Sequence, residues 1–180
     1  MSILYFETPR FLVRQWEPGD ADALLAIMSD PRVHTYTGDE PWDMGRVQGY
    51  LGYMREQDFR TLETYHGAYV LKSTGELVGF TGLNPYLPGQ PELEWQLGAA
   101  HWGKGYATEV GLASIAEAFR TTGITAIYGM ANPDNRASMR ALEKIGMTCL
   151  GLQEFRGHMD MFYRIDRSAF ADDAAASSAI

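Results

Sequence analysis

The sequence predicts a single α/β domain built around a mixed β-sheet. Two apolar runs, 65–71 and 77–83, flank the short turn Lys72–Glu76, which indicates an antiparallel hairpin. Further along, a strand at 92–97, a helix from about 108 to about 120 and a strand at 124–130 form a crossover unit. The two strands of such a unit run parallel. At 180 residues and 46% hydrophobic, the chain can bury one substantial core but is too short for two domains of ordinary size.

The first expected strand spans 11–13 and stops at the turn 17–20, where Asp20 is placed to cap a helix. That helix ends before Pro31, because the residue preceding a proline avoids the helical region. A polar loop at 35–41 follows.

A second helix is expected from about residue 43 to about residue 59. Three glycines lie within it, at positions 45, 49 and 52. Each disfavours the helix by about 1 kcal/mol relative to alanine, so a bent or dynamic helix is expected.

The strand 92–97 follows a predicted loop at 85–91 and alternates polar with apolar residues. Glu92, Glu94 and Gln96 therefore share one face. Such a face most often points to solvent, and the alternative is that it lines a cleft.

The helix that follows this strand carries two stripes. The apolar residues expected to face the sheet are Leu112, Ile115, Ala116 and Phe119. The small residues expected to let another backbone approach closely are Ala107, Gly111 and Ser114.

The last predicted helix opens at Asn132-Pro133, with Asn132 as its cap, and closes at Gly146. Its inner stripe is expected to consist of Ser138, Ala141, Leu142 and Ile145. Two final strands, 147–155 and 158–165, are expected to turn at residues 156–157.

The composition favours some partners and disfavours others. The 15 Lys and Arg against 23 Asp and Glu give a net charge of −8, which opposes binding to nucleic acid. The same charge suits a cationic substrate, although it also serves solubility alone. The single cysteine, Cys149, excludes an intramolecular disulfide, and nothing resembles zinc-ligand spacing.

Signals for export or membrane insertion are not recognised in the sequence. The N-terminal residues lack a basic region followed by an apolar stretch, and no apolar run approaches the roughly 18 residues that a membrane span needs. We therefore expect a cytoplasmic protein with no membrane partner. Residues 1–170 are expected to form the domain, and the Ala- and Ser-rich residues 171–180 a frayed tail.

The segment Gly103–Thr108 lies where a strand ends and a helix begins. Backbone N–H groups at a helix start, together with the helix dipole, form a site for an anion such as pyrophosphate. Gly103 and Gly105 let oxygens approach the backbone, and Lys104 or Thr108 can add a donor. A glycine-rich turn without a ligand is the alternative. The Walker A and dinucleotide-binding patterns do not fit the segment.

Three segments carry a resemblance to a known family. Trp102–Glu109 (WGKGYATE) resembles the coenzyme A signature [QR]-x-x-G-x-[GA] of GNAT acetyltransferases. Asn132–Met147 (NPDNRASMRALEKIGM) resembles their second motif, in which two asparagines and a serine precede a basic residue and Gly-[FM]. Thr8–Arg14 (TPRFLVR) is similar to the opening strand of the RimJ/RimL-like branch, whose named members acetylate N-termini of ribosomal proteins. The likeness covers roughly residues 8–170.

The resemblance implies a GNAT fold. That fold is a mostly antiparallel sheet of about seven strands with about four helices, and its parallel pair splays apart at the coenzyme site. It also implies acetyl-CoA as co-substrate, with no metal. The coenzyme contacts carried over onto this sequence are Leu97, Gly98, Trp102, Gly103, Lys104, Gly105, Tyr106, Ala107, Thr108, Asn132, Asn135, Ser138 and Lys144.

Two positions depart from the family pattern. Trp102 replaces the usual Gln or Arg, and Leu142 stands where several GNAT enzymes carry a tyrosine that protonates the departing thiolate. Another acid is therefore needed. Ser138 lies one helical turn before Leu142 and matches a serine to which RimJ/RimL-like enzymes assign a role at the sulfur; packing against the core is its alternative role.

The family mechanism is direct transfer from the thioester to an amine, so no covalent intermediate is required. Glu94, and after it Glu92, can pass the amine's proton through a water to bulk solvent. An unrelated structural role for both is the alternative. Cys149 lies in an apolar strand and is expected to be a small core residue rather than a nucleophile.

The expected acceptor is the N-terminal α-amine of a protein or peptide. The alternatives are a small amine, such as a polyamine, an amino acid or an aminoglycoside, and an acyl-CoA-binding sensor without turnover. Candidate acceptor contacts are Tyr36, Trp42 and Trp95. Each histidine of the chain is expected to have a structural role. The pair His158 and Asp160 is not sufficient to predict a metal site. The protein is expected to be a monomer or a homodimer.

Overall fold

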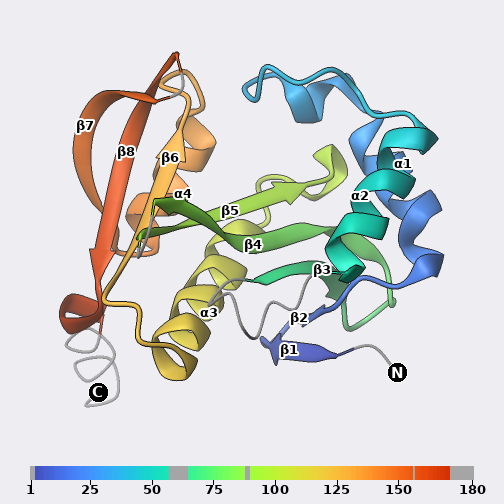
Figure 1. Cartoon of the computed structure of the whole chain (residues 1–180), viewed down its shortest axis with the longest axis horizontal. Helices are drawn as coiled ribbons and strands as arrows, with labels where there is room; N and C mark the ends of the chain where they lie inside the picture. The colour runs from blue at the N-terminus through green and yellow to red at the C-terminus, as the bar shows by residue number, and fades with distance from the viewer. Residues whose placement is uncertain (1–2, 57–64, 88–89, 156, 171–180) are drawn as a thin grey trace.

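The computed structural model describes residues 3–56, 65–87, 90–155 and 157–170. The predicted tail, the end of the second predicted helix and Arg156 of the last predicted turn lie outside these residues. Within them, one eight-stranded sheet runs through the molecule in the order β1-β2-β3-β4-β5-β6-β8-β7 (Figure 1). The strands are β1 (Leu4–Glu7), β2 (Phe11–Arg14), β3 (Tyr65–Leu71), β4 (Leu77–Leu87), β5 (Gln90–Leu97), β6 (Ala126–Ala131), β7 (Thr148–Phe155) and β8 (His158–Asp166).

Helices cover both faces of this sheet. The α-helices are α1 (Ala21–Met28), α2 (Met44–Glu56), α3 (Tyr106–Thr121) and α4 (Arg136–Lys144), and short 3-10 turns lie at η1 (Pro18–Asp20), η2 (Pro31–His34) and η3 (Ala99–His101). Among the described helices, none combines the length and the apolar character needed to cross a bilayer.

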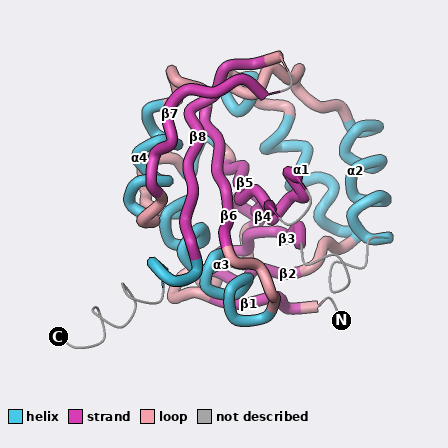
Figure 2. Tube along the Cα trace, turned by 60° about the vertical axis from the view of Figure 1, so that its left-hand side comes forward, coloured by secondary structure: helices cyan, strands magenta, loops and turns pink. Residues whose placement is uncertain are grey.

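The mixed sheet that the sequence predicts is confirmed. Its recorded pairs are antiparallel except β5 with β6, which run parallel and are joined at Glu92 and Tyr128. Beyond that pair β5 continues to Leu97 and β6 to Ala131, and the two strands diverge (Figure 1). On the other side of β6 the sheet is continuous, because β6 pairs with β8 along its whole length (Figure 2). A wedge therefore opens between β5 and β6.

Two strand predictions need correction. β1 was not predicted, because Leu4–Glu7 is too short and irregular to show a period. The loop expected at 85–91 does not exist in that form, since β4 reaches Leu87 and β5 begins at Gln90. Pro85 pairs with Pro91 across this hairpin, so two residues that cannot donate a ladder hydrogen bond oppose each other near its end.

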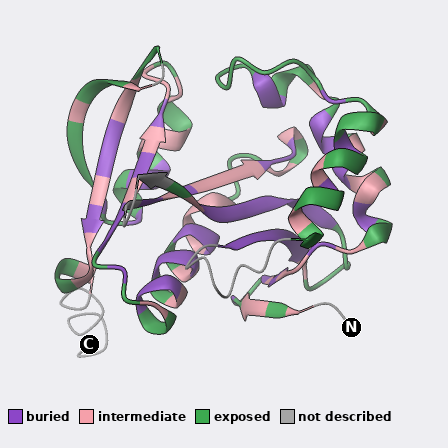
Figure 3. Cartoon of the chain, viewed as in Figure 1, coloured by how far each residue is buried: buried purple, intermediate pink, exposed green. Residues whose placement is uncertain are grey.

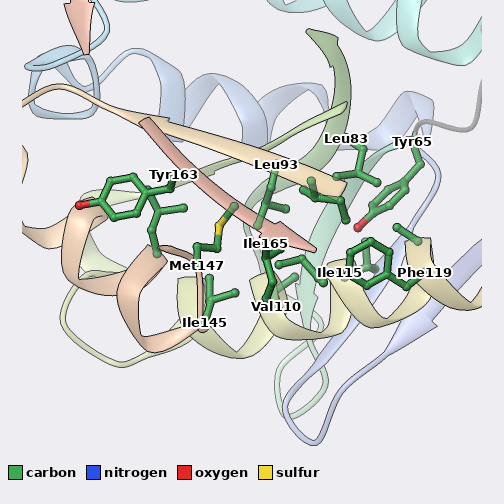
Figure 4. Close-up of a cluster of buried hydrophobic side chains, with 14 of the residues drawn as sticks. Tyr65, Leu83, Leu93, Val110, Ile115, Phe119, Ile145, Met147, Tyr163 and Ile165 are labelled. Atoms are coloured by element: carbon green, nitrogen blue, oxygen red, sulfur yellow. The ribbon is translucent and has the colours of Figure 1, made fainter. Parts of the chain in front are cut away.

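Each face of the sheet has its own apolar core. α1 and α2 pack on one face, over side chains such as Ala68, Val70 and Phe80. α3 and α4 pack on the other, where Leu93, Ile115 and Met147 lie together with other core side chains (Figure 4).

The predicted apolar stripe of α3 has the wrong phase. Ile115 and Phe119 are buried, but Leu112 is 38% exposed and Ala116 is exposed. The buried side instead includes the small residues Gly111 and Ser114. A Cβ on Gly111 would lie 2.5 Å from Ile145 Cδ1, so close packing against the end of α4 selects the buried side, as the stripe of small residues predicted.

Two predicted caps are wrong in detail. The cap of α4 is Asn135, whose Oδ1 accepts a hydrogen bond from Ser138 N at 3.1 Å, whereas Asn132 Oδ1 accepts from Asp134 N in the preceding turn. Asp20 occupies the cap position of α1 but makes no side-chain bond to that helix. Its carboxylate instead binds the Arg14 guanidinium and Glu17 N.

Cys149 is exposed, which overturns its expected place in the core. It lies on β7, the edge strand of the sheet, and most of β7 is exposed (Figure 3). The apolar sequence of this strand misled the prediction, because edge strands can carry apolar side chains in water.

Candidate active site

The turn before α3 has a backbone that requires glycine at two positions. Gly103 and Gly105 both have a φ of +74°, the left-handed region that favours glycine. A Cβ at Gly103 would meet nothing within 4 Å, so backbone conformation rather than crowding requires glycine there. α3 starts at Tyr106, and the first N–H groups of a helix have no partner inside it. Those of Ala107 and Thr108 are therefore placed to bind an anion.

The β1–β2 turn is clamped onto the same helix start through Glu109. Its carboxylate accepts hydrogen bonds from Thr8 Oγ1 at 2.6 Å, Arg10 N at 3.0 Å and Arg10 Nε at 2.5 Å. Burial raises the pKa of Glu109, but the bonds from Thr8 and Arg10 outweigh it and hold this pKa below its ordinary value. The clamp thus sets a cation, Arg10, beside the turn: its Nη1 donates to the Lys104 carbonyl at 3.1 Å.

Other predicted coenzyme contacts lie in this turn or just before it. Trp102 is 49% exposed, and its Nε1 donates to the Leu97 carbonyl at 2.9 Å. Gly98 N donates to the Val78 carbonyl, so the N–H of Gly98 is already used within the sheet. Lys104 is exposed, with Nζ 5.8 Å from the centre of the Tyr106 ring.

The predicted contacts on α4 divide into two places. Asn132, Asn135 and Ser138 lie just past the end of β6, beside the wedge. Ser138 Oγ makes no hydrogen bond with another described residue and is half-buried. Lys144 stands at the opposite end of α4, about 13 Å along the helix axis from Asn135.

A cavity of about 470 Å³ lies on the α1–α2 face of the sheet. Its lining includes Glu94, the candidate base, and the candidate acceptor contacts Trp42 and Trp95. Gln96 also lines it, so this face of β5 borders a cleft. Tyr36 and Glu92 are not among the described lining residues. The remaining described lining residues are Met28, His34, Thr37, Asp39, Tyr50, Met54, His66, Phe80 and Asn84.

A polar network at this cavity joins three strands and α2. Glu94 Oε1 lies 2.7 Å from His66 Nε2, and Asn84 Nδ2 donates to Glu94 Oε2. Asn84 Oδ1 lies 2.8 Å from His66 Nε2, and Tyr50 OH lies 3.1 Å from His66 Nδ1. The His66 side chain is 4% exposed, so these partners replace water around a buried imidazole.

The network shifts the ionisation of its members. Burial lowers the pKa of His66, but the charge of Glu94 and the hydrogen bonds to Glu94 and Asn84 outweigh it and raise that pKa above its ordinary value. Burial and the charge of Glu94 raise the pKa of Tyr50 well above its ordinary range. Tyr50 therefore stays a neutral phenol, able to donate or accept a hydrogen bond.

Sequence reasoning missed His66, Asn84 and Tyr50 as functional candidates. The strand register places His66 opposite Gly82, and Gly82 opposite Glu94. A glycine inside a strand often marks the close approach of another group, and this signal could have pointed to His66. The histidine was expected to be structural because its partners come from other elements.

The other histidines have local partners or lie on the surface. His34 Nε2 lies 2.8 Å from the Met28 carbonyl, and His101 Nε2 lies 3.3 Å from a Glu76 carboxylate oxygen. His158 is exposed at the start of β8. None of these three contacts Glu94.

Comparison with known proteins agrees with this geometry. Residues 10–148 match the family model described as the acetyltransferase (GNAT) domain. A Bacillus licheniformis protein, named as the uncharacterized N-acetyltransferase p20, is 28% identical over 155 residues, covering 84% of this chain and 85% of its own.

Solved structures show the same fold. The crystal structure of an Agrobacterium tumefaciens acetyltransferase matches with a TM-score of 0.75 and 29% identity, over 89% of this chain and 92% of that one. A Vibrio cholerae spermidine N-acetyltransferase, solved with CoA and spermine, matches with a TM-score of 0.73 and 18% identity, over 89% and 98%. The chain belongs to the GNAT family of N-acetyltransferases, enzymes that use acetyl-CoA as acetyl donor.

Proposed function

We propose that this chain transfers the acetyl group of acetyl-CoA directly to the N-terminal α-amine of a protein or peptide, as in the RimJ/RimL-like branch. The observation that carries the proposal is Glu94, a carboxylate in an aromatic-lined cavity beside the wedge where β5 and β6 diverge. A carboxylate there can accept a hydrogen bond, and then a proton, from an amine that reaches the wedge.

The residues around the wedge fit the coenzyme. The N–H groups of residues 103–108, with Lys104 and Arg10 beside them, suit a diphosphate. Asn132, Asn135 and Ser138, between the end of β6 and the first turn of α4, are proposed to contact the pantetheine arm. When bound, acetyl-CoA supplies a thioester carbonyl for the amine to attack and a thiolate as leaving group.

Two side chains are proposed to handle protons. Glu94 takes the proton of the attacking amine, and it is favoured over Glu92 because only Glu94 of these two is among the described cavity residues. The Ser138 hydroxyl has no described partner, so it is free to donate a hydrogen bond to the leaving sulfur.

The paired charges of the cavity favour an amine with one basic group over a polyamine. Among its described lining residues the acids are Glu94 and Asp39, and each faces a basic side chain: His66 at 2.7 Å and Arg46 at 3.1 Å. A polyamine would leave several cations without a carboxylate. The likeness to a spermidine acetyltransferase keeps small amines as the second candidate.

The test is release of free thiol from acetyl-CoA with a panel of acceptors. We expect release with peptides that carry a free N-terminus and none with the same peptides blocked at that amine. Faster release with spermidine, amino acids or aminoglycosides would move the acceptor to that class. Coenzyme binding without thiol release across the whole panel would instead indicate a sensor.

A pair of variants tests the base. Glu94→Gln is expected to lower kcat about 100-fold while leaving acetyl-CoA affinity nearly unchanged, since general-base catalysis contributes roughly 10²–10⁴-fold. Glu92→Gln is the matched change on the same strand face, and it is expected to keep most of the activity. The reverse pattern would assign the base to Glu92.

A further inference from the structure

We infer that His66 is a specificity-determining residue of the acceptor cavity: its positive charge cancels that of Glu94, so the cavity accepts amines in their neutral form and selects weakly basic amines. This inference rests on the proposed acetyl transfer to an amine. It adds that acceptors are selected by their basicity, and it assigns this selection to the His66 side chain.

The hydrogen-bond pattern fixes a proton on His66 Nε2. Asn84 Nδ2 donates to Glu94, so the amide is oriented with Oδ1 toward His66. The two atoms near Nε2, Asn84 Oδ1 and Glu94 Oε1, are therefore both acceptors, and a nitrogen between two acceptors must carry a hydrogen.

The other ring nitrogen can carry a proton at the same time. His66 Nδ1 faces Tyr50 OH at 3.1 Å, and a phenol oxygen accepts a hydrogen bond as readily as its hydrogen donates one. The network therefore satisfies an imidazolium fully, and the raised pKa of His66 favours that form. The proposed state of the pair, whose atoms lie 2.7 Å apart, is a carboxylate with an imidazolium, which together carry no net charge.

Most of the remaining charged and titratable groups around the cavity are neutral or paired. Tyr50 on α2 stays a neutral phenol, and His34 binds the Met28 carbonyl. Asp39 is paired with Arg46, whose guanidinium lies 4.7 Å from the centre of the Trp42 ring. Glu92 lies one pleat further along β5, opposite Asn84.

A neutral cavity discriminates between amines by their basicity. An alkylammonium ion entering it would bring an unbalanced charge into a partly desolvated site, whereas the neutral amine brings none and is already the nucleophile. At pH 7.5 an amine with a pKa of about 7.9 is roughly a quarter neutral and one with a pKa of about 10.4 roughly a thousandth neutral. Selection for the neutral form therefore predicts about a 200-fold preference for the weaker base.

During transfer the proton and electron balance is simple. The amine lone pair forms the C–N bond, the C–S bond breaks with its electron pair on sulfur, and the proton lost by nitrogen goes to Glu94. The products are the amide and, after the thiolate gains a proton, the free thiol. His66 keeps its charge throughout and acts on the acceptor through Glu94.

The first experiment measures kcat/KM at pH 7.5 for ethylamine, 2-fluoroethylamine and 2,2-difluoroethylamine, which share a shape but fall in basicity in that order. For the wild-type enzyme, kcat/KM is expected to rise as basicity falls, in step with the neutral fraction. In His66→Gln the amide can still bond Glu94 but carries no charge, so Glu94 gains an affinity for ammonium. The ratio between the weakest and strongest base is expected to shrink at least tenfold.

The control is His158→Gln, a histidine on the surface, which is expected to keep the wild-type ratio. A folded His66→Gln enzyme with the wild-type dependence on basicity would overturn the inference. If no acceptor at all gives thiol release while coenzyme binds, the proposed function fails instead.

A second measurement needs no variant. NMR titration of the His66 ring in the intact enzyme is expected to show an imidazolium at pH 7.0, and a lower midpoint in Glu94→Gln. A neutral His66 ring at pH 7.0 would contradict the inference, whatever the activities of the variants.

Discussion

Gly82 is the residue that makes the His66–Glu94 contact sterically possible. Its strand neighbours are His66 on β3 and Glu94 on β5, and the His66 ring crosses over it to reach the carboxylate. A Cβ at Gly82 would lie 2.6 Å from His66 Nε2 and 2.5 Å from the Tyr65 carbonyl oxygen. Neither the ring nor the backbone carbonyl can yield without breaking the network.

Gly82→Ala is therefore expected to lower the free energy of unfolding by about 1–3 kcal/mol through overpacking, and to lower kcat as well. Chemical denaturation and thiol release measure the two effects. Gly49→Ala makes the same change in α2, where a Cβ meets nothing within 4 Å, and is expected to be neutral or to raise stability by about 0.5–1 kcal/mol. A Gly82→Ala enzyme as stable and active as the wild type would show that the ring does not need this space.

A second prediction concerns the charge beside the coenzyme turn. Arg10→Gln is expected to raise the KM for acetyl-CoA about tenfold, because it removes a cation and leaves the charge of Glu109 unbalanced near the proposed diphosphate site. Adding Glu109→Gln removes the unpaired anion and is expected to restore part of the loss. Steady-state kinetics of the single and double variants measure this coupling.

The control for this cycle is Arg120→Gln, which breaks an Arg–Glu pair on the exposed far end of α3. It is expected to leave the KM for acetyl-CoA unchanged. Purely additive effects of Arg10→Gln and Glu109→Gln would argue against charge compensation at the turn.

At the scale of elements, the sequence predicts most helices and strands and misplaces several of their details. Alternation along 92–97 and the glycines at the start of α3 are local patterns, so both are read correctly. The buried side of α3 depends on its contact with Ile145, at the C-terminal end of α4. The exposure of Cys149 depends on the position of β7 at the edge of the sheet. Such features arise from packing between elements, and the local hydrophobic periodicity of the sequence does not report that packing.

The corrected cap of α4 leads to a prediction about stability. Asn135→Ala is expected to lower the free energy of unfolding by about 1 kcal/mol, because Asn135 Oδ1 accepts from Ser138 N at the helix start. Asn132→Ala is expected to change stability by about 0.5 kcal/mol or less, since Asn132 bonds only within the preceding turn. Thermal denaturation of the two variants compares them directly, and a larger loss for Asn132→Ala would restore the cap that the sequence predicted.

At the scale of the whole molecule, one gap in the sheet links the two halves of the proposed site. The proposed coenzyme residues around Gly105 and Asn135 follow β5 and β6 in the chain, and Glu94, the proposed base, lies on β5 next to the β5–β6 pairing. The motifs at 102–109 and 132–147 suffice to predict the coenzyme side, since each is contiguous in sequence. The acceptor side combines Tyr50, His66, Asn84 and Glu94 from four elements, so only the fold reveals it.

The most direct test of this account is a crystal structure of the protein with coenzyme A. We predict that the diphosphate lies on the backbone N–H groups of residues 103–108 and the thiol between the diverging ends of β5 and β6, pointing toward the Glu94 cavity. Coenzyme bound at another place, or a turn that stays empty at saturating coenzyme, would contradict it.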